Sequence, residues 1–158
     1  MKKLPYVFRL NTPDDRNYIL RSWLKTWRDE PINSKLPTSV YYAEANPLFG
    51  NILERFGAIV VCNPNDFNQI YGFAVCAFIP VAEEWILFWL QVKAQYSRLG
   101  IGKALFNYLN FGFKGPICPF VRDKLRNLIG ELNIIDNPYI LNMISEMSDL
   151  KSAEYKLI

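Results

Sequence analysis

Two glycines set between a strand pattern and a helix pattern are the residues of this chain best suited to hold a ligand. Gly100 and Gly102 follow the apolar run 84–92 and precede a helical pattern, and Lys103 comes directly after the second glycine. The first N–H groups of a helix have no intrahelical partner and carry the positive end of its dipole. Glycine also lets a ligand approach the backbone closely. The stretch 97–103 therefore predicts an anion site of the kind that binds phosphate groups.

Two common phosphate-binding loops do not fit this spacing. A P-loop requires GxxxxGK followed by Ser or Thr, whereas Lys103 is followed by Ala104, so the hydroxyl that holds magnesium is missing. A dinucleotide-binding loop requires GxGxxG inside a βαβ unit, but the third position is Leu105 and no such unit surrounds it. The structural alternative is a bare turn into a helix, for which one glycine would suffice.

The candidates for proton transfer are few, because the chain contains no histidine. Histidine is the commonest general base and metal ligand, so Ser-His-Asp and Cys-His enzymes are excluded. Glu83 and Glu84 stand at the start of the run 84–92 and are candidate general bases, although two charges there also suit an exposed hairpin turn. Tyr139 and Tyr71 are weaker candidates for a general acid, since aromatic side chains more often belong to the core.

The three cysteines are widely spaced and form no CxxC pair, so they predict neither a disulfide framework nor a zinc site. We interpret Cys62, Cys76 and Cys118 as small core residues in a reducing compartment, and we expect no metal.

The size and charge of the chain indicate one globular domain over residues 1–158. With 158 residues, of which 51% are hydrophobic, it has enough apolar side chains for a core. The net charge of +3 is uneven. Residues 93–126 hold seven basic residues and one acid, whereas residues 130–158 hold five acids and two lysines. Such a basic segment is usually a solvated surface, but its position around the glycines also suits a phosphorylated ligand.

The first half of the chain predicts a strand, two helices and a three-stranded antiparallel unit. A strand is expected over 6–10, and a helix after it with Thr12 as N-cap and Pro13 first. A second helix is predicted to begin at Asn46 and Pro47 by the same logic. Apolar runs then predict strands over 58–62, 70–79 and 84–92, the first two joined by the turn-rich segment 63–69.

The second half predicts a helix over 102–111, an edge strand near 116–119 and, in the segment that begins at Phe120, a further helix ending at Gly130. Residues 133–136 suit a strand, residues 137–147 a helix, and residues 153–158 a final strand. The expected fold class is α/β (α+β), with a mixed, mostly antiparallel central sheet flanked by helices. The long apolar region 72–92 is divided by Pro80 and two glutamates, so it predicts buried strands and no membrane span. Arg9 interrupts the first apolar run too early for a signal peptide, and we expect a cytoplasmic protein.

The stretch VKAQYSRLGIGKAL resembles the acyl-coenzyme A loop of the GCN5-related N-acetyltransferase (GNAT) superfamily. In that family an apolar strand ending in Val leads to [QR]-x-x-G-x-[GA] and a helix, and the order of elements expected here over 6–130 is similar. The resemblance implies a GNAT-like fold with acetyl-CoA as cofactor. Main-chain groups around Leu90, Gln91 and Val92 would hold the pantetheine arm. The pyrophosphate would be held by Ser97, Arg98, Leu99, Gly100, Ile101, Gly102 and Lys103.

The resemblance implies an acyl-CoA-dependent N-acyltransferase whose acceptor is a primary amine, on a small molecule or on a protein lysine or N-terminus. Two departures keep another class open. Ser97 occupies the [QR] position, and Arg126 stands where many members carry the tyrosine that protonates the leaving thiolate. A catalytically silent binding module of the same fold is therefore the alternative, and a nucleic-acid-modifying relative is a third. The early segment SWLKTWR and the segment IYGFAV are also similar to acetyltransferase-like proteins of bacteriophages, which would place the protein in a host cytoplasm.

Overall fold

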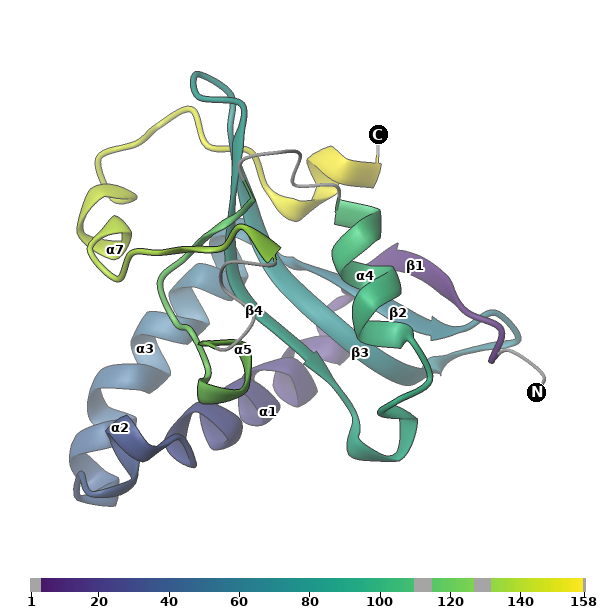
Figure 1. The fold of residues 1–158 in the computed structure, drawn as a ribbon, viewed down its shortest axis with the longest axis horizontal. Helices are drawn as coiled ribbons and strands as arrows, with labels where there is room; N and C mark the ends of the chain where they lie inside the picture. Colours follow the sequence, from purple (N-terminus) through teal and green to yellow (C-terminus); the bar gives the residue numbers. More distant parts are fainter. Residues whose placement is uncertain (1–3, 110–114, 127–131, 158) are drawn as a thin grey trace.

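The computed structural model describes residues 4–109, 115–126 and 132–157. They form a six-stranded sheet in the order β1 to β6, shown in Figure 1. Antiparallel pairing joins β1 (Val7–Leu10), β2 (Ala58–Asn63), β3 (Asp66–Ile79) and β4 (Glu84–Val92). Parallel pairing adds β5 (Ile117–Cys118) and β6 (Ile135–Asp136). The predicted fold class, a mixed and mostly antiparallel sheet with flanking helices, is confirmed, as are the three neighbouring strands predicted over 58–92.

Helices cover both faces of this sheet (Figure 1). On one face lie α1 (Arg16–Arg28), preceded by the 3-10 turn η1 (Pro13–Asp15), and α3 (Thr38–Phe56), joined by the short α2 (Pro31–Ser34). On the other lie α4 (Ile101–Leu109) and the 3-10 helix η3 (Ala153–Leu157). The remaining short helices are η2 (Ala94–Tyr96), α5 (Asp123–Arg126) and α7 (Ile140–Met143). None of the helices in the described part of the chain has both the length and the apolar character that a membrane span requires.

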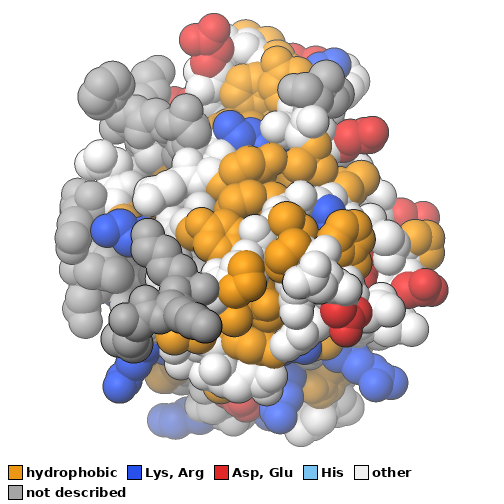
Figure 2. All heavy atoms as spheres, turned by 90° about the vertical axis from the view of Figure 1, so that its right-hand side faces the viewer, with side chains coloured by type: hydrophobic (Ala, Val, Ile, Leu, Met, Phe, Trp, Pro, Cys, Tyr) orange, Lys and Arg blue, Asp and Glu red, His pale blue; other side chains and the backbone are white. Residues whose placement is uncertain are grey.

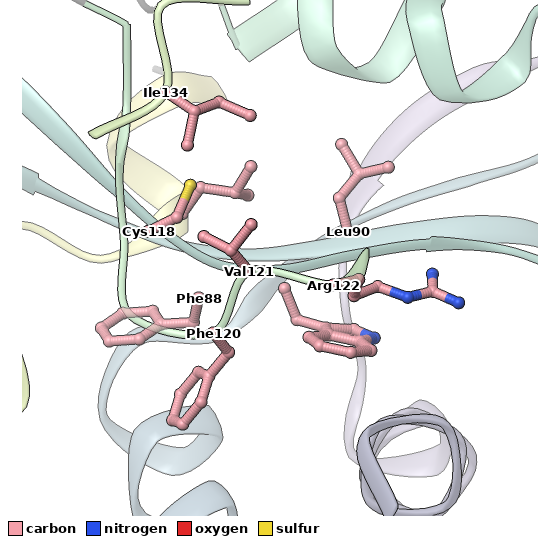
Figure 3. A pocket seen from close by; sticks show the side chains of 9 residues that line it. Phe88, Leu90, Cys118, Phe120, Val121, Arg122 and Ile134 are labelled. Atoms are coloured by element: carbon pink, nitrogen blue, oxygen red, sulfur yellow. The ribbon is translucent and has the colours of Figure 1, made fainter. Parts of the chain in front are cut away.

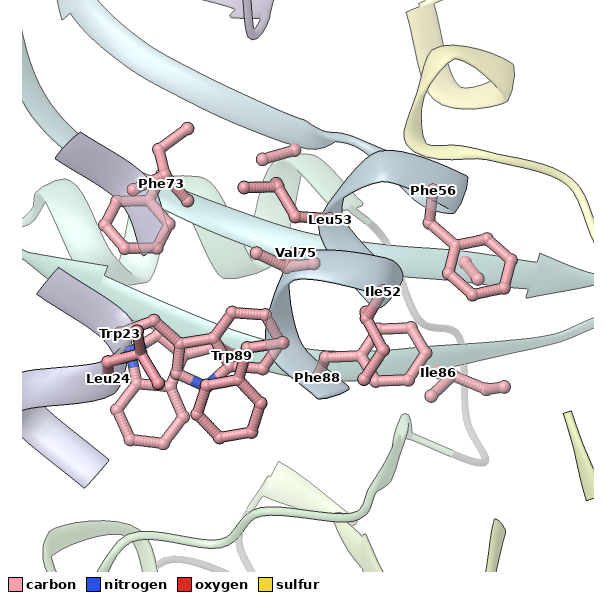
Figure 4. Packing of buried hydrophobic residues seen from close by; sticks show 14 of the residues in the cluster. Trp23, Leu24, Ile52, Leu53, Phe56, Phe73, Val75, Ile86, Phe88 and Trp89 are labelled. Atoms are coloured by element: carbon pink, nitrogen blue, oxygen red, sulfur yellow. The ribbon is translucent and has the colours of Figure 1, made fainter. Parts of the chain in front are cut away.

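The layer between the sheet and α1 and α3 is packed by aromatic rings together with aliphatic side chains (Figure 4). Trp23 of α1 stacks on Phe49 of α3 with ring centroids 4.0 Å apart, and lies 6.3 Å from the Trp89 ring of β4. Phe56 stacks on Phe88, also of β4, at 5.5 Å. Rings of this size bury large apolar areas and prefer a few packing geometries, so they fix the two helices firmly against β4.

The opposite layer is built by α4, η3 and β1, which meet on the face shown in Figure 2. Leu105 and Leu109 of α4 are fully buried there. Phe8 of β1 stacks on Tyr108 of α4 at 4.0 Å, and Lys156 of η3 lies 5.7 Å from the same Tyr108 ring. These contacts fix the axis of α4, and with it the position of its N-terminus.

The start of α1 is anchored by a charge cluster at the end of β1. Thr12 is the cap residue, as expected. The Asp15 carboxylate accepts hydrogen bonds from the Thr12 N–H at 2.7 Å and from the Arg9 guanidinium at 2.6 Å. Burial alone would raise the pKa of Asp15, but the hydrogen bonds from Arg9 and Thr12 outweigh it and hold that pKa below its ordinary value. The pair therefore stabilises the junction of β1 and α1 at neutral pH.

The predicted start of the second long helix was wrong, because α3 begins at Thr38 and carries Pro47 in its interior. A proline inside a helix costs about 3 kcal/mol. The turns before it offset this cost by packing: Tyr41 and Ala45 are buried, and the Tyr41 hydroxyl donates to the Leu24 carbonyl of α1 at 2.5 Å.

Three further expectations need correction. The turn between β2 and β3 is shorter than predicted, because Asn63 already pairs with Asp66. The segment near 117 lies inside the sheet between β4 and β6, since both of its neighbours pair with it, and is no edge strand. The C-terminal segment forms η3 instead of a strand, and a single bridge from Lys151 to Phe78 takes the place of a ladder. The predicted ends of the helices over 102–111 and before Gly130 lie outside the described residues.

Candidate cofactor cleft and helix terminus

The candidate site starts where β4 leads into α4. After Val92 the chain makes the 3-10 turn η2 and a tight loop in which Arg98 and Gly100 adopt left-handed angles, with φ of 65° and 81°. The first hydrogen bond of α4 joins the Ala104 N–H to the Gly100 carbonyl at 2.9 Å. The N–H groups of residues 101–103 therefore precede the helical ladder and point out of its positive end. Left-handed residues beside such groups produce the concave backbone that anions prefer.

The two glycines differ in what the protein itself requires of them. Gly100 needs its left-handed angle, which other residues adopt only with strain. Gly102 does not: its φ lies outside the left-handed region, and a Cβ there would sit 3.5 Å from the Val92 Cγ2 atom, an ordinary contact. Glycine in a helix is about 0.5–1 kcal/mol less favourable than alanine. Neither packing nor backbone geometry in the described structure explains this cost.

A cleft opens along the other side of β4, because β5 stays beside it only briefly. The parallel pairing is confined to Ile86 and Ile117, and β4 then continues to Val92 without β5 beside it. The Lys93 N–H donates to the Tyr71 carbonyl of β3 at 2.9 Å. Since alternate residues of an antiparallel strand point their main-chain groups to opposite sides, those of Leu90 and Val92 point away from β3, into this opening.

A bulge interrupts β4 in the middle of the cleft. Val75 pairs with Trp89 and Cys76 with Leu87, so Phe88 has no partner opposite it on β3. As a result, both Phe88 and Trp89 pack in the layer with α1 and α3, where strict alternation would place them on opposite faces. The Trp89 indole N–H donates to the Gln91 side chain at 2.9 Å, which fixes that ring.

The cleft is lined by apolar side chains from three segments, as Figure 3 shows. Its walls come from β4, from β5 with the residues that follow it, and from Ile134 just before β6. The side chains fill it to a free volume of about 10 Å³, which is close to the space that one water needs. The lining residues are Leu87, Phe88, Trp89, Leu90, Cys118, Phe120, Val121, Arg122 and Ile134. Burial raises the pKa of the Cys118 thiol to about 12, so this thiol is uncharged at neutral pH.

One ion pair closes the cleft on the side of α1. The Arg122 guanidinium lies 5.2 Å from the Trp89 ring and donates to the Glu30 carboxylate at 3.3 Å. The same carboxylate also accepts the Asp123 N–H at 3.4 Å. Glu30 thereby ties the segment after β5 to the junction of α1 and α2, and both charged side chains are largely buried.

The residues predicted to bind a cofactor lie in two stretches of the chain that the turn η2 joins. Leu90, Gln91 and Val92 lie at the end of β4, and 97–103 form the loop and the first turn of α4. Within this set, Ser97 donates to the Ala94 carbonyl at 2.7 Å, Leu99 is 51% exposed, and Ile101 is buried in the core. The side chains of Arg98 and Lys103 are exposed beside the loop.

The residues predicted for proton transfer lie apart from this group. Glu83 sits in the β3–β4 turn with φ of 52°, and Glu84 begins β4, so both are at the end of the strand opposite the glycines. Tyr139 is 73% exposed at the N-cap of α7. Tyr71 is 1% exposed, its ring packs 4.5 Å from that of Tyr96, and burial raises its pKa.

Sequence reasoning did not find the second wall of the cleft. Phe120, Val121 and Arg122 lie in a segment that was predicted to be helical. Glu30 and Arg122 are 92 residues apart in the sequence, and no local sequence pattern predicts that they pair. The bulge is also invisible in the sequence, because every residue from Trp85 to Leu90 is apolar and shows no alternation to break.

Comparisons with known proteins give matches among solved structures only. No protein-family model matches the chain, and the search of curated proteins found no match. Solved structures that match include acetyltransferases described as members of the GNAT family, as the sequence resemblance predicted. A protein of Desulfovibrio desulfuricans shares 18% identity with a TM-score of 0.43, covering 66% of this chain, and this chain spans 64% of that one. An acetyltransferase of Pyrococcus furiosus shares 16% identity over 90% of this chain and 91% of its own, with a TM-score of 0.49. A ribosomal-protein-alanine N-acetyltransferase of Brucella melitensis shares 16% identity over 89% and 88%, with a TM-score of 0.37.

Proposed function

We propose that this protein is an acyl-CoA-dependent N-acyltransferase that acts on a primary amine. The observation that carries the proposal is the placement of Gly102. This glycine lowers the stability of the helix, and no packing contact requires it. It lies at the N-terminus of α4, close to the end of β4, where the open edge of that strand presents the main-chain groups of Leu90 and Val92. An elongated ligand with an anionic end and amide groups along its length fits both features at once.

Different residues of the chain would bind different parts of coenzyme A. The N–H groups of Gly102 and Lys103, with the exposed side chains of Arg98 and Lys103, would hold the pyrophosphate of coenzyme A. Leu90 and Val92 would pair with the amides of its arm as a missing strand would. When bound, acyl-coenzyme A supplies an activated acyl group as a thioester. Binding requires the side chains that fill the cleft to move aside, since the free volume is small.

Positioning and exclusion of water would account for much of the rate. The apolar walls around Phe88, Phe120 and Val121 keep water from the centre of the cleft. Holding two reactants in a productive arrangement supplies several kcal/mol of the barrier by itself. The bulge at Phe88 interrupts the regular pairing of β4 with β3 at the middle of the cleft, where we propose that the reacting group would lie.

A carboxylate must accept the proton that the amine loses, and Glu84 and Glu83 are our proposed bases. Glu84 is four residues before Phe88, which corresponds to about 14 Å along a strand at roughly 3.4 Å per residue. A proton would therefore reach it through water and not by direct transfer. Tyr139 is our proposed general acid. Because its side chain is exposed, it would exchange protons with solvent.

The test combines binding with turnover. We expect coenzyme A to bind to the protein in calorimetry, and acetyl-CoA to release free thiol in the presence of amines that include lysine peptides. Gly102→Glu should abolish binding, because it adds both bulk and a like charge at the anion site. Asn107→Glu adds the same charge on an exposed position of α4 and should leave binding unchanged. Equal affinities of the Gly102→Glu variant and the parent protein would refute the site.

A catalytically silent binding module is the second candidate, and the surroundings of Arg126 favour it. This residue replaces the expected tyrosine and forms ion pairs with Asp136 at 3.1 Å and Asp123 at 3.5 Å, so it serves as a structural link between α5 and β6. Binding of coenzyme A without thiol release for any amine offered would support this candidate over the enzyme.

A further inference from the structure

A second pocket lies next to the cofactor cleft, on the side of α1, α2 and α3. Phe120 lines both cavities, so the two are neighbours across one ring. The pocket has a volume of about 360 Å³, within the range of small-molecule sites. We call it the α1–α3 pocket.

The walls of the α1–α3 pocket are aromatic and apolar. Four rings line it, those of Trp27, Tyr41, Phe49 and Phe120. Three exposed aliphatic side chains extend the wall, one from the connection before α3 and two from α3 itself: Leu36, Val40 and Leu48, which are 41%, 48% and 37% exposed. Exposed apolar side chains grouped around a hollow indicate a binding surface, and aromatic faces also attract cations.

The polar groups that face the pocket are hydrogen-bond acceptors. Glu44 supplies a carboxylate, and among the described residues it forms no ion pair. Asn33 is 9% exposed, and its amide nitrogen donates to the Trp27 carbonyl at 2.8 Å. Its amide oxygen accepts no hydrogen bond from the described residues, so it is free to accept one from a ligand.

The basic residue beside this pocket is already engaged. Arg28 lies 5.5 Å from the Tyr41 ring, and its N–H groups donate to the main-chain oxygens of Asn33 and Leu36. It does not line the pocket, whose lining contains neither Lys nor Arg. The combination of acceptors, one negative charge and aromatic walls is complementary to an ammonium group on an apolar body.

We infer that the α1–α3 pocket binds the acceptor, and that this acceptor is a primary amine carried on an aromatic or branched aliphatic body. The inference rests on the proposed transferase function and narrows its substrate class. Amines with several charges and little apolar surface, such as polyamines, fit these walls poorly because they would leave ammonium groups against apolar side chains.

The test measures amine binding without coenzyme A, by ligand-observed NMR with phenethylamine, its neutral analogue 2-phenylethanol, and spermidine. We expect phenethylamine to bind at least 10-fold more tightly than either of the others. Glu44→Gln should weaken phenethylamine about 10-fold and leave 2-phenylethanol unchanged. Glu54→Gln removes the same charge from another exposed position of α3 outside this pocket and should change neither affinity. Leu48→Trp fills the pocket from an exposed position and should weaken both aromatic ligands.

Two results would overturn the inference: spermidine binding as tightly as phenethylamine, or Glu44→Gln leaving the phenethylamine affinity unchanged. The Gly102→Glu variant separates this test from that of the proposed function, because it should lose coenzyme A and keep phenethylamine. Thiol release that prefers spermidine, with Glu44→Gln unaffected, would leave the transferase standing and reject the pocket. Selective amine binding without any coenzyme A binding would support the pocket and reject the transferase.

Discussion

Replacing Gly102 by alanine should raise the stability of the protein and weaken its binding of coenzyme A. The added Cβ would lie 3.5 Å from Val92 Cγ2, and the backbone angle at this position is not left-handed, so the fold accepts the methyl group without strain. Alanine is about 0.8–1 kcal/mol better than glycine inside a helix. Because Gly102 is only the second residue of α4, we expect about half of this gain. For a chain of this length that corresponds to an increase in Tm of about 1–2 °C.

The effect on binding should have the opposite sign. If the pyrophosphate approaches the N–H groups of Gly102 and Lys103, a methyl group there displaces it from at least one charge-assisted hydrogen bond. Such a bond contributes about 1.5–3 kcal/mol, which corresponds to a 10- to 100-fold increase in Kd. Differential scanning calorimetry of the free protein and titration calorimetry with coenzyme A measure the two changes separately.

Gly100→Ala provides the matched control for this experiment. No heavy atom lies within 4 Å of the Cβ that it would add, but its φ of 81° costs an alanine about 1–2 kcal/mol, so this variant should be less stable than the parent. A more stable Gly102→Ala variant that binds coenzyme A with unchanged affinity would show that no ligand approaches the glycine, and the central argument for the site would fail.

Four further variants test the proton path, the sheet and the β1–α1 junction. Glu84→Gln should slow acyl transfer by about 10²–10⁴-fold, mostly below mildly alkaline pH, where the amine most needs a base. Glu83→Gln should slow it by less, because Glu83 lies outside the strand. An unchanged pH–rate profile for both variants would exclude the two residues as general bases. Gly72→Ala should cost about 1–3 kcal/mol in the free energy of unfolding, since the new Cβ would lie 2.7 Å from the Gln91 carbonyl oxygen, and denaturant titration that gave an unchanged stability would contradict that spacing. Asp15→Asn should cost about 1.5–3 kcal/mol at pH 7. Because the pKa of Asp15 is lowered in the folded state, the stabilisation it gives is present above its ordinary pKa of 3.8 and is lost as the pH falls below that value, so parent and variant should converge in acid unfolding curves.

The sequence was sufficient for the elements whose residues act locally. Long apolar runs bounded by turn residues identified β2, β3 and β4, and Thr12 with Pro13 identified the start of the first helical segment. The glycine loop was also found from sequence, because a strand, two glycines and a helix follow one another directly. Where tertiary packing outweighs local preference the prediction failed, as it did at Pro47, whose helix is stabilised by contacts of Tyr41 and Ala45 with other parts of the fold.

The proposed cleft could be predicted only on one side. Its first wall is a continuous strand, but its second wall depends on where β5 leaves β4, and β5 is only two residues long. Such a short strand has too few residues for a periodic pattern, and its direction is decided by packing against both layers. The tie between Glu30 and Arg122 depends on the same long-range arrangement, so neither could be read from neighbouring residues.

The glycines show most directly what the structure adds to the sequence. Gly72 and Gly115 are required by close packing, since a Cβ would lie 2.7 Å from the Gln91 oxygen and 1.9 Å from the Asn133 oxygen. Gly100 is required by its left-handed backbone angle. Gly102 meets neither requirement, and neither does Gly50, which lies inside α3 with only the Arg16 side chain 3.6 Å from the Cβ position. What distinguishes Gly102 from Gly50 is its position, because it lies in the first turn of α4, where the N–H groups precede the helical hydrogen bonds, and directly after the left-handed segment at Gly100. That position, and not the lost helix stability alone, is why we propose that the anionic end of a cofactor binds there.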